Sequence, residues 1–186
     1  MIALLRGKII EKEPMAAIID CQGLGLKVHI PLSTSHKIGE KGDMTSLYIE
    51  TVFNRDGFAL YGFVSKEERT LFNNLTEVPG IGPRAALNLL SRFEADEAKK
   101  LIAEGKVEIL RTIPGIGPKK AAMIVFKLKD RVEKSAMEPD LITDAIKALA
   151  ALGITQKEAK ARLQKIPNIT DLTLTEILRK ALSNVE

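Results

Sequence analysis

A glycine-rich turn flanked by prolines occurs twice in this chain of 186 residues, as VPGIGP at residues 78–83 and as IPGIGP at residues 113–118. The two copies align without a gap, and each is followed directly by a basic residue, Arg84 or Lys119. Two glycines around one isoleucine allow a sharp backbone turn with the isoleucine directed inward as an anchor. The last proline of each copy suits the first position of a helix. Each copy therefore predicts a tight connection between two helices.

The predicted turns also suit contact with an anion. The start of a helix presents free N–H groups and the positive end of the helix dipole, and Arg84 or Lys119 adds a cation beside it. Backbone amides and one cation can hold a nucleic-acid phosphate, in a contact that is independent of base sequence and sensitive to salt. The candidate DNA-contacting residues are Gly80, Ile81, Gly82, Arg84, Gly115, Ile116, Gly117, Lys119 and Lys120.

Two other interpretations of the repeat compete with DNA contact. The turns could serve only to connect packed helices. A mononucleotide-binding loop is disfavoured, because the chain has no G-x-x-x-x-G-K-[ST] motif and because the turns join helices instead of following a strand.

The excess positive charge lies around the repeat. The net charge is +4, and residues 64–135 carry 14 Lys or Arg against 10 Asp or Glu, while the segments on either side are neutral. This placement favours a polyanionic partner. The single cysteine, Cys21, excludes an intramolecular disulfide and indicates a reducing compartment. Because no apolar run is long enough to span a membrane, we expect a cytoplasmic protein.

The sequence indicates neither a metal site nor a catalytic centre. Cys21, His29 and His36 lack the spacing of metal ligands. No nucleophile–base arrangement is evident, and the acids after the second turn, Asp130 and Glu133, do not by themselves make a nuclease or glycosylase site. We therefore expect no cofactor and no catalytic residue.

Hydrophobic periodicity divides the chain into three regions. Residues 1–63 carry short β-rich runs between glycine-rich turns, which predicts an OB-like β-barrel. Residues 64–133 carry helical periodicity interrupted by the two turns, which predicts an all-α domain. The polar segment 134–140, which contains Pro139, is predicted to be a linker, and residues 141–186 a small three-helix bundle. The fold class is therefore α+β.

Local signals give approximate bounds for the elements. Strands are expected near residues 2–10, 16–20, 25–30, 44–53 and 58–63, and helices near 85–91, 94–105, 107–111 and 119–132. Capping boxes, in which a Ser or Thr is followed three residues later by a Glu, predict further helix starts. These pairs are Ser65 with Glu68, Thr155 with Glu158, and Thr173 with Glu176.

The two turns resemble paired helix-hairpin-helix motifs, and the chain as a whole resembles the RuvA family of Holliday-junction-binding proteins. The resemblance covers nearly all of the chain and lies in a specific order of landmarks. These are MIALLRGKII at the N-terminus, LYGF (60–63), KEERTLF (66–72), the two PGIGP turns, KLKDR (127–131) and ALAALGITQKEA (148–159).

The resemblance implies an OB-like first domain, a double helix-hairpin-helix domain and a small tethered third domain. It implies a homotetramer, or an octamer of two tetramers, that holds a four-way junction open during recombination, DNA repair and the SOS response. The subunit itself would be non-catalytic: the RuvB ATPase would drive branch migration, and the RuvC resolvase would be a further partner. The glycines and basic residues of both turns would grip the phosphates of the junction arms.

The resemblance also assigns roles outside the repeat. The turn NRDG at residues 54–57 is where the family places an acidic pin at the junction centre. Relatives often carry two adjacent acids there, whereas this chain has Arg55 and then Asp56, and an ordinary Asp-Gly hairpin turn is the alternative. In the third domain, Leu149, Leu152 and Ile154 would belong to an apolar surface that binds the RuvB ATPase. The alternative is that these three residues form the core of the helical bundle.

Four aromatic residues of the first domain allow two interpretations. Phe53, Phe58, Tyr61 and Phe63 could form a platform on which bases stack, but we expect core packing to be their main role.

Two functions of other classes compete with junction binding. One is a helix-hairpin-helix repair nuclease or glycosylase, and the other is a general module that binds duplex DNA. Cleavage or base release would indicate the first, and equal affinity for junction and linear duplex would indicate the second.

Overall fold

The computed structural model describes residues 1–54, 57–137, 141–164, 166, 169 and 172–183. The chain forms two compact units, Met1–Val132 and Glu133–Glu186. The first unit has two hydrophobic clusters, one in the barrel and one among the helices, and the second unit has one. The first unit contains both the strands and the helices of the repeat.

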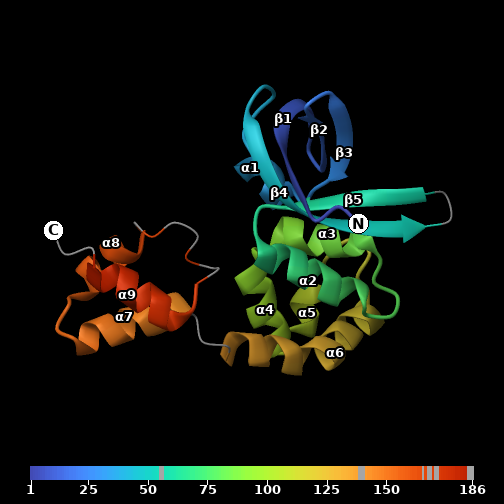
Figure 1. Cartoon of the computed structure of the whole chain (residues 1–186). Coiled ribbons are helices and arrows are strands. Elements are labelled where there is room, and N and C mark those ends of the chain that lie inside the picture. Colours follow the sequence, from blue (N-terminus) through green and yellow to red (C-terminus); the bar gives the residue numbers. More distant parts are fainter. Residues whose placement is uncertain (55–56, 138–140, 165, 167–168, 170–171, 184–186) are drawn as a thin grey trace. The chain divides into compact units, whose positions relative to one another are not determined.

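A closed five-stranded barrel opens the first unit (Figure 1). Its strands are β1 (Leu4–Glu13), β2 (Ala16–Cys21), β3 (Leu24–His29), β4 (Met44–Asn54) and β5 (Gly57–Phe63). The strand order is β1-β2-β3-β5-β4; β3 and β5 pair in parallel and the other neighbours are antiparallel. This closed five-stranded barrel confirms the OB-like fold expected from the sequence.

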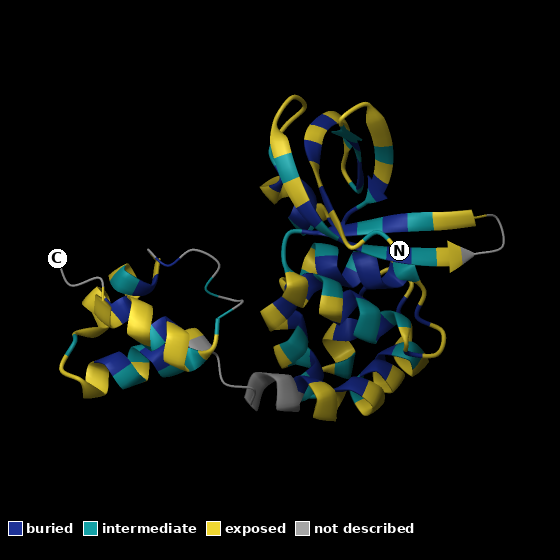
Figure 2. Ribbon diagram, in the orientation of Figure 1, coloured by how far each residue is buried: buried dark blue, intermediate teal, exposed yellow. Residues whose placement is uncertain are grey.

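Alternation of side chains explains why these segments close into a barrel. In β1, Leu5 and Ile9 are buried while Arg6 and Lys8 are exposed, as a strand with one face toward a core requires. Position 7, in this strand, has room only for glycine, because a Cβ there would lie 2.2 Å from the carbonyl oxygen of Asp20 on β2. Figure 2 shows the buried residues recurring along the strands.

The helical part of the first unit contains both predicted turns. Its helices are α2 (Lys66–Thr76), α3 (Pro83–Arg92), α4 (Ala95–Ala103), α5 (Val107–Leu110) and α6 (Pro118–Met137). Their buried apolar side chains form one cluster that also includes Phe63 at the end of β5. The barrel therefore continues directly into the helical core.

Two features differ from the sequence-based expectation: one additional helix and the end of α6. A short helix, α1 (Leu32–Lys37), lies between β3 and β4 and was not predicted. The predicted linker, residues 134–140, is helical as far as Met137 because α6 continues through it; residues 138–140 lie outside the described residues. Polar composition alone does not end a helix, and three of the four residues at 134–137, Lys134, Ala136 and Met137, favour helical structure.

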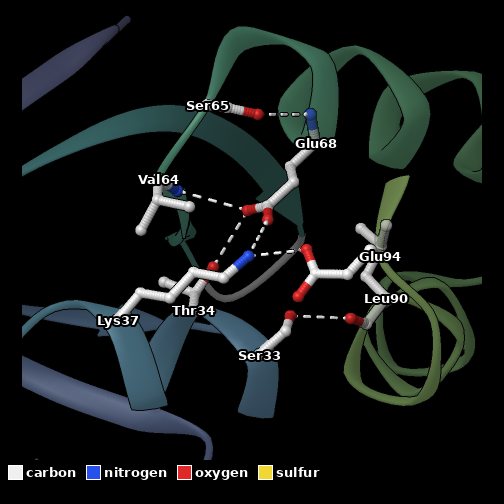
Figure 3. A network of polar contacts seen from close by, with 8 residues as sticks. All are labelled: Ser33, Thr34, Lys37, Val64, Ser65, Glu68, Leu90 and Glu94. Atoms are coloured by element: carbon white, nitrogen blue, oxygen red, sulfur yellow. Dashed lines mark hydrogen bonds and ion pairs between the residues drawn. The ribbon is translucent and has the colours of Figure 1, made fainter. Parts of the chain in front are cut away.

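A buried carboxylate joins α1 to the helices (Figure 3). The side chain of Glu68 is buried, and its Oε2 accepts hydrogen bonds from Thr34 Oγ1 at 3.0 Å and from the backbone N–H of Val64 at 3.3 Å. Ser65 caps α2 by accepting from the N–H of Glu68, as predicted. Lys37 pairs with both Glu68 and Glu94, and its hydrogen bond to Glu94 raises the pKa of the Lys37 ammonium.

The second unit contains α7 (Leu141–Ala151), α8 (Gln156–Gln164) and α9 (Leu174–Ser183). Both predicted capping boxes form: Glu158 accepts from the N–H and hydroxyl of Thr155, and Glu176 from those of Thr173. These hydrogen bonds to the charged form lower the pKa of each glutamate. The predicted three helices of this region are thus confirmed.

Candidate nucleic-acid interface

The first turn joins α2 to α3 in a compact hydrogen-bonded geometry. The N–H of Val78 donates to the carbonyl of Leu75, and the N–H of Ile81 donates to the carbonyl of Val78, each at 3.0 Å. Gly80 has a φ of +84°, a conformation that residues with a side chain rarely adopt. The side chain of Ile81 is buried in the helical core, so it anchors the turn as expected.

The second turn repeats this geometry between α5 and α6. Gly115 has a φ of +87°, and the N–H of Ile116 donates to the carbonyl of Ile113 at 2.9 Å. The side chain of Ile116 is buried in the same core cluster as that of Ile81. The repeated sequence therefore folds into the same local structure twice, with both isoleucines offering only their backbones to a ligand.

Both turns lead into exposed helix starts. In α3 the first helical hydrogen bond runs from the N–H of Ala86 to Gly82, and in α6 from Ala121 to Gly117. The N–H groups just before these bonds belong to the start of each helix, where the backbone has no partner further back in the helix. Gly82 caps α3 in extended conformation with a φ of −92° and no side-chain hydrogen bond.

The basic residues behind the turns are accessible. Arg84 and Lys119 are both exposed, as are the turn glycines, including Gly82 and Gly117. A positive side chain thus lies next to each accessible helix start. This arrangement is the one expected of an anion site built from backbone amides and a neighbouring cation.

The fold brings the two turns together although 35 positions separate them in the sequence. They line one open hollow of about 460 Å³. Its residues are Gly82, Arg84, Ala85 and Asn88 from the first copy and Pro114, Gly115 and Lys120 from the second. A Cβ added to Gly115 would lie 3.5 Å from the Cβ of Ala85, so the backbones approach closely. The two candidate anion sites therefore belong to one continuous surface.

Lys120 and Asn88 connect the two turns. The Nζ of Lys120 donates to the carbonyl of Gly115 at 3.0 Å, and its Cε lies 3.6 Å from where a Cβ of Gly80 would be. The side-chain amide of Asn88 donates to the carbonyl of Pro114 at 3.0 Å. Sequence reasoning missed Asn88, because the repeat places Met123 at the equivalent position and so gave no signal.

Arg84 also lies beside the barrel. It lines a second hollow, of about 350 Å³, with Leu87 of its own helix and with Met15, His29 and Tyr61 from the barrel. Burial raises the pKa of the Tyr61 hydroxyl above its ordinary value. The first turn is thus continuous with the surface of β5.

The aromatic residues divide into two groups. Phe63 is buried and the Tyr61 ring stacks on Phe72, which confirms core packing for these two positions. For Phe53 and Phe58 the expectation of core packing is wrong, because 70% and 56% of their surfaces are exposed. They face each other one pair before the end of the β4–β5 hairpin, beyond the residues of β5 that pair with β3.

The remaining candidates have different environments. Arg55 and Asp56 lie outside the described residues. Leu149 is completely buried, so at this position the core interpretation is correct, whereas 63% of Leu152 is exposed and Ile154 packs partly against the core. Leu149 lies within α7 and faces its core, whereas Leu152 lies beyond the end of this helix at Ala151.

The described residues contain no group of three or more His, Cys, Asp or Glu that could hold a metal ion. Among them, no helix is both long enough and apolar enough to cross a membrane. Cys21 is a free, partly exposed thiol at the end of β2.

Comparisons with known proteins agree with the two halves of the first unit. Residues 1–62 match the family described as RuvA N terminal domain, and residues 72–130 match the SAM-like Helix-hairpin-helix tandem. Three relatives carry the name Holliday junction branch migration complex subunit RuvA. The protein from Caldanaerobacter subterraneus is 41% identical over 86% of this chain and 87% of its own length. Those from Chromobacterium violaceum and Pseudomonas aeruginosa are 36% and 34% identical over 100% of this chain and 98% and 100% of their lengths.

Proposed function

This chain belongs to the RuvA family of Holliday junction branch migration complex subunits, and from that membership we propose that it binds four-way DNA junctions. The observation that carries the proposal is the juxtaposition of the two turns. Each turn leads into an accessible helix start that is followed by an exposed basic residue, Arg84 or Lys119. The two turns share one hollow, which Gly82 and Arg84 line from the first copy and Gly115 and Lys120 from the second. Two anion sites of this kind suit two neighbouring phosphates of one duplex arm.

The proposed contacts do not read base sequence. Backbone N–H groups and the side chains of Arg84 and Lys119 can bind phosphate oxygens, which are the same at every base pair. Binding should therefore depend on the shape of the DNA and weaken as salt concentration rises. In this role Asn88 helps to hold the spacing between the turns through its hydrogen bond to Pro114. Lys120 donates to the carbonyl of Gly115 within the second copy and lines the shared hollow, so it stays a proposed DNA contact.

The four-fold shape of the junction requires assembly. We propose a homotetramer, or two tetramers on opposite faces, in which each subunit holds one arm. The subunit itself is non-catalytic and cytoplasmic, the RuvB ATPase supplies the motor, and the RuvC resolvase acts on the same junction. The complex would serve recombination, DNA repair and the SOS response.

The hairpin turn at residues 54–57 is the proposed pin. A carboxylate near the crossing strands would repel their phosphates and help to keep the strands apart. Arg55 offsets part of the charge of Asp56, so the repulsion is weaker than with two acids. Replacing Asp56 by Asn should alter the rate of branch migration without affecting folding, and an unchanged rate would remove the pin from the proposal.

The second unit carries the proposed motor-binding surface, with Leu152 as its exposed centre and Ile154 beside it. Leu152→Ala should weaken binding of the RuvB ATPase without changing thermal unfolding, because this side chain is mostly exposed. Leu149→Ala should instead destabilise the bundle by about 2–5 kcal/mol, because it removes buried volume. Leu182→Ala, also at an exposed leucine, is the matched control. Unchanged RuvB binding by the Leu152 variant would place the motor surface elsewhere.

A competition binding assay tests the main proposal. The protein is titrated onto a labelled immobile four-way junction, with unlabelled junction or linear duplex of the same base composition as competitor. The junction should compete far better than the duplex. Equal competition would support a general duplex-binding module, and strand cleavage or base release in the presence of Mg²⁺ would support a nuclease or glycosylase.

A further inference from the structure

The tip of the β4–β5 hairpin carries two exposed phenylalanine rings. Phe53 on β4 and Phe58 on β5 are direct cross-strand partners, with ring centroids 6.2 Å apart and ring planes inclined by 53°. Among the described residues, Phe126 on α6 is the only other exposed aromatic residue. Isolated exposed rings are common on protein surfaces, but two exposed rings that face each other across two strands form a local apolar surface. No other part of the fold that the structure describes covers this surface.

The register explains why the rings are exposed. Phe53 continues the row of β4 that includes Ile49 and Thr51, and those two residues are buried inside the barrel. Phe58 likewise continues the inward row of β5, in which Leu60 is buried. The strand β3 pairs with β5 only at Leu60 and Tyr61, so the hairpin beyond them is a two-stranded ribbon (Figure 1). The row that faces the core within the barrel therefore continues into solvent. Figure 2 shows the ends of β4 and β5 next to the turn as exposed.

We propose that the Phe53–Phe58 rung is a stacking surface for a DNA base at the branch point of the junction. This inference rests on the proposed function and names an additional contact within it. Every base has a flat π-face that can stack on an aromatic ring, independently of its sequence. A base at a branch point lacks a continuous stack on one side, and a phenylalanine ring can replace the missing neighbour.

The size of the surface favours a base over a protein partner. A stable protein–protein interface buries roughly 800 Å² on each side, which is far more than one rung of two side chains presents. One ring matches the face of one base. A second copy of this chain could still cover the rings, and the experiment below separates that outcome.

The position of the rung also favours DNA. Tyr61 of β5 and Arg84 of α3 line one hollow, so the strand that carries Phe58 adjoins the first candidate phosphate site. In Figure 1 the hairpin projects on the same side of the unit as the start of α6. The start of α6 carries the second candidate phosphate site. A duplex arm held by the turns could thus lead toward the hairpin.

A double-mutant cycle between protein and DNA tests the proposal. The protein variant is Phe53→Leu with Phe58→Leu, which keeps the apolar character of the rung but removes both π-faces. The DNA variant is a four-way junction with abasic sites at the branch-point nucleotides. Binding is measured by fluorescence anisotropy for the four combinations, together with sedimentation velocity and thermal unfolding of both proteins. Phe126→Leu is the matched control at an exposed phenylalanine far from the hairpin in the sequence.

The expected result is specific to stacking. The double variant should bind the intact junction at least about fivefold more weakly than the wild type, and both proteins should bind the abasic junction equally well. Linear duplex affinity, sedimentation and thermal unfolding should not change, and Phe126→Leu should bind like the wild type. Full affinity of the double variant for the intact junction would overturn the proposal.

Two further outcomes would also overturn it, each for a distinct reason. An equal loss of affinity for intact and abasic junctions would mean that the rings do not contact bases. A smaller assembly in sedimentation would mean that the rings join subunits. If instead the wild-type protein shows no preference for a junction over linear duplex, the proposed function itself fails, and this failure is visible without any variant.

Discussion

Replacing Gly82 by serine should separate DNA binding from folding. Gly82 is the N-cap of α3, its φ of −92° is open to any residue, and an added Cβ would meet no atom within 4 Å. Serine is preferred over glycine at an N-cap by a few tenths of a kcal/mol, and loss of a glycine reduces the conformational freedom of the unfolded chain by about 0.4–1 kcal/mol. Gly82→Ser should therefore leave the free energy of unfolding unchanged or raise it by up to about 1 kcal/mol.

The same substitution should weaken junction binding. The serine side chain would occupy the exposed space at the start of α3, and its hydroxyl would accept from the N–H groups of Arg84 or Ala85. These are the N–H groups that we propose for a phosphate oxygen. A hydrogen bond to a charged group contributes about 1.5–3 kcal/mol, so the loss corresponds to a roughly 10- to 100-fold weaker affinity.

Urea unfolding and fluorescence anisotropy with a labelled junction measure the two quantities on one sample. Gly117→Ser tests the second turn in the same way, because an added Cβ there also meets no atom within 4 Å. Gly80→Ser is the contrasting variant: its φ of +84° should cost about 1–2 kcal/mol of stability. Unchanged junction affinity of Gly82→Ser and Gly117→Ser, in stable proteins, would refute the idea that the helix starts contact phosphates.

Two further predictions concern charge. The double variant Arg84→Ala with Lys119→Ala should weaken junction binding and reduce the slope of log affinity against log salt by about one unit for each lost contact, measured by anisotropy at several salt concentrations. The control Lys41→Ala, at an exposed lysine of the first unit, should leave this slope unchanged. If the double variant keeps the slope of the wild type, neither side chain contacts the phosphates. Because the pKa of Glu176 is lowered in the folded state, its bonds to Thr173 stabilise α9 above the ordinary pKa of 4.5 and are lost as pH falls below it. The protection factors of the α9 amides, which are exchange rates corrected for the intrinsic effect of pH, should thus fall more between pH 6 and pH 3 in the wild type than in Glu176→Gln. An equal fall in both proteins would contradict the capping role.

Local signals in the sequence were sufficient for most of the secondary structure. The capping residues Ser65, Thr155 and Thr173 each begin a helix as predicted, because a cap depends only on a side chain and the backbone two or three residues away. The glycine turns form for the same reason. The predicted end of α6 is wrong because polar composition does not stop a helix, and the strongest helix breaker in this segment is Pro139.

Elements that depend on distant partners were missed. The helix α1 has the sequence LSTSHK, whose serines and threonine do not favour a helix. Its buried Thr34 bonds to Glu68 and Ser33 bonds to the carbonyl of Leu90, so contacts with α2 and α3 stabilise it. The exposure of Phe53 likewise depends on where β3 stops pairing with β5, which no pattern within β4 reveals.

The sequence alone determined that each PGIGP segment is a tight turn into a helix with a cation behind it. This outcome is local, because glycine adopts the positive φ at Gly80 and Gly115 without the strain that a side chain would add, and proline suits the first helical position. Only the tertiary structure decided that the two turns form one surface. Burial of Ile81 and Ile116 in one core brings Ala85 against Gly115, and packing between segments 35 residues apart is a property of the whole core and not of either repeat.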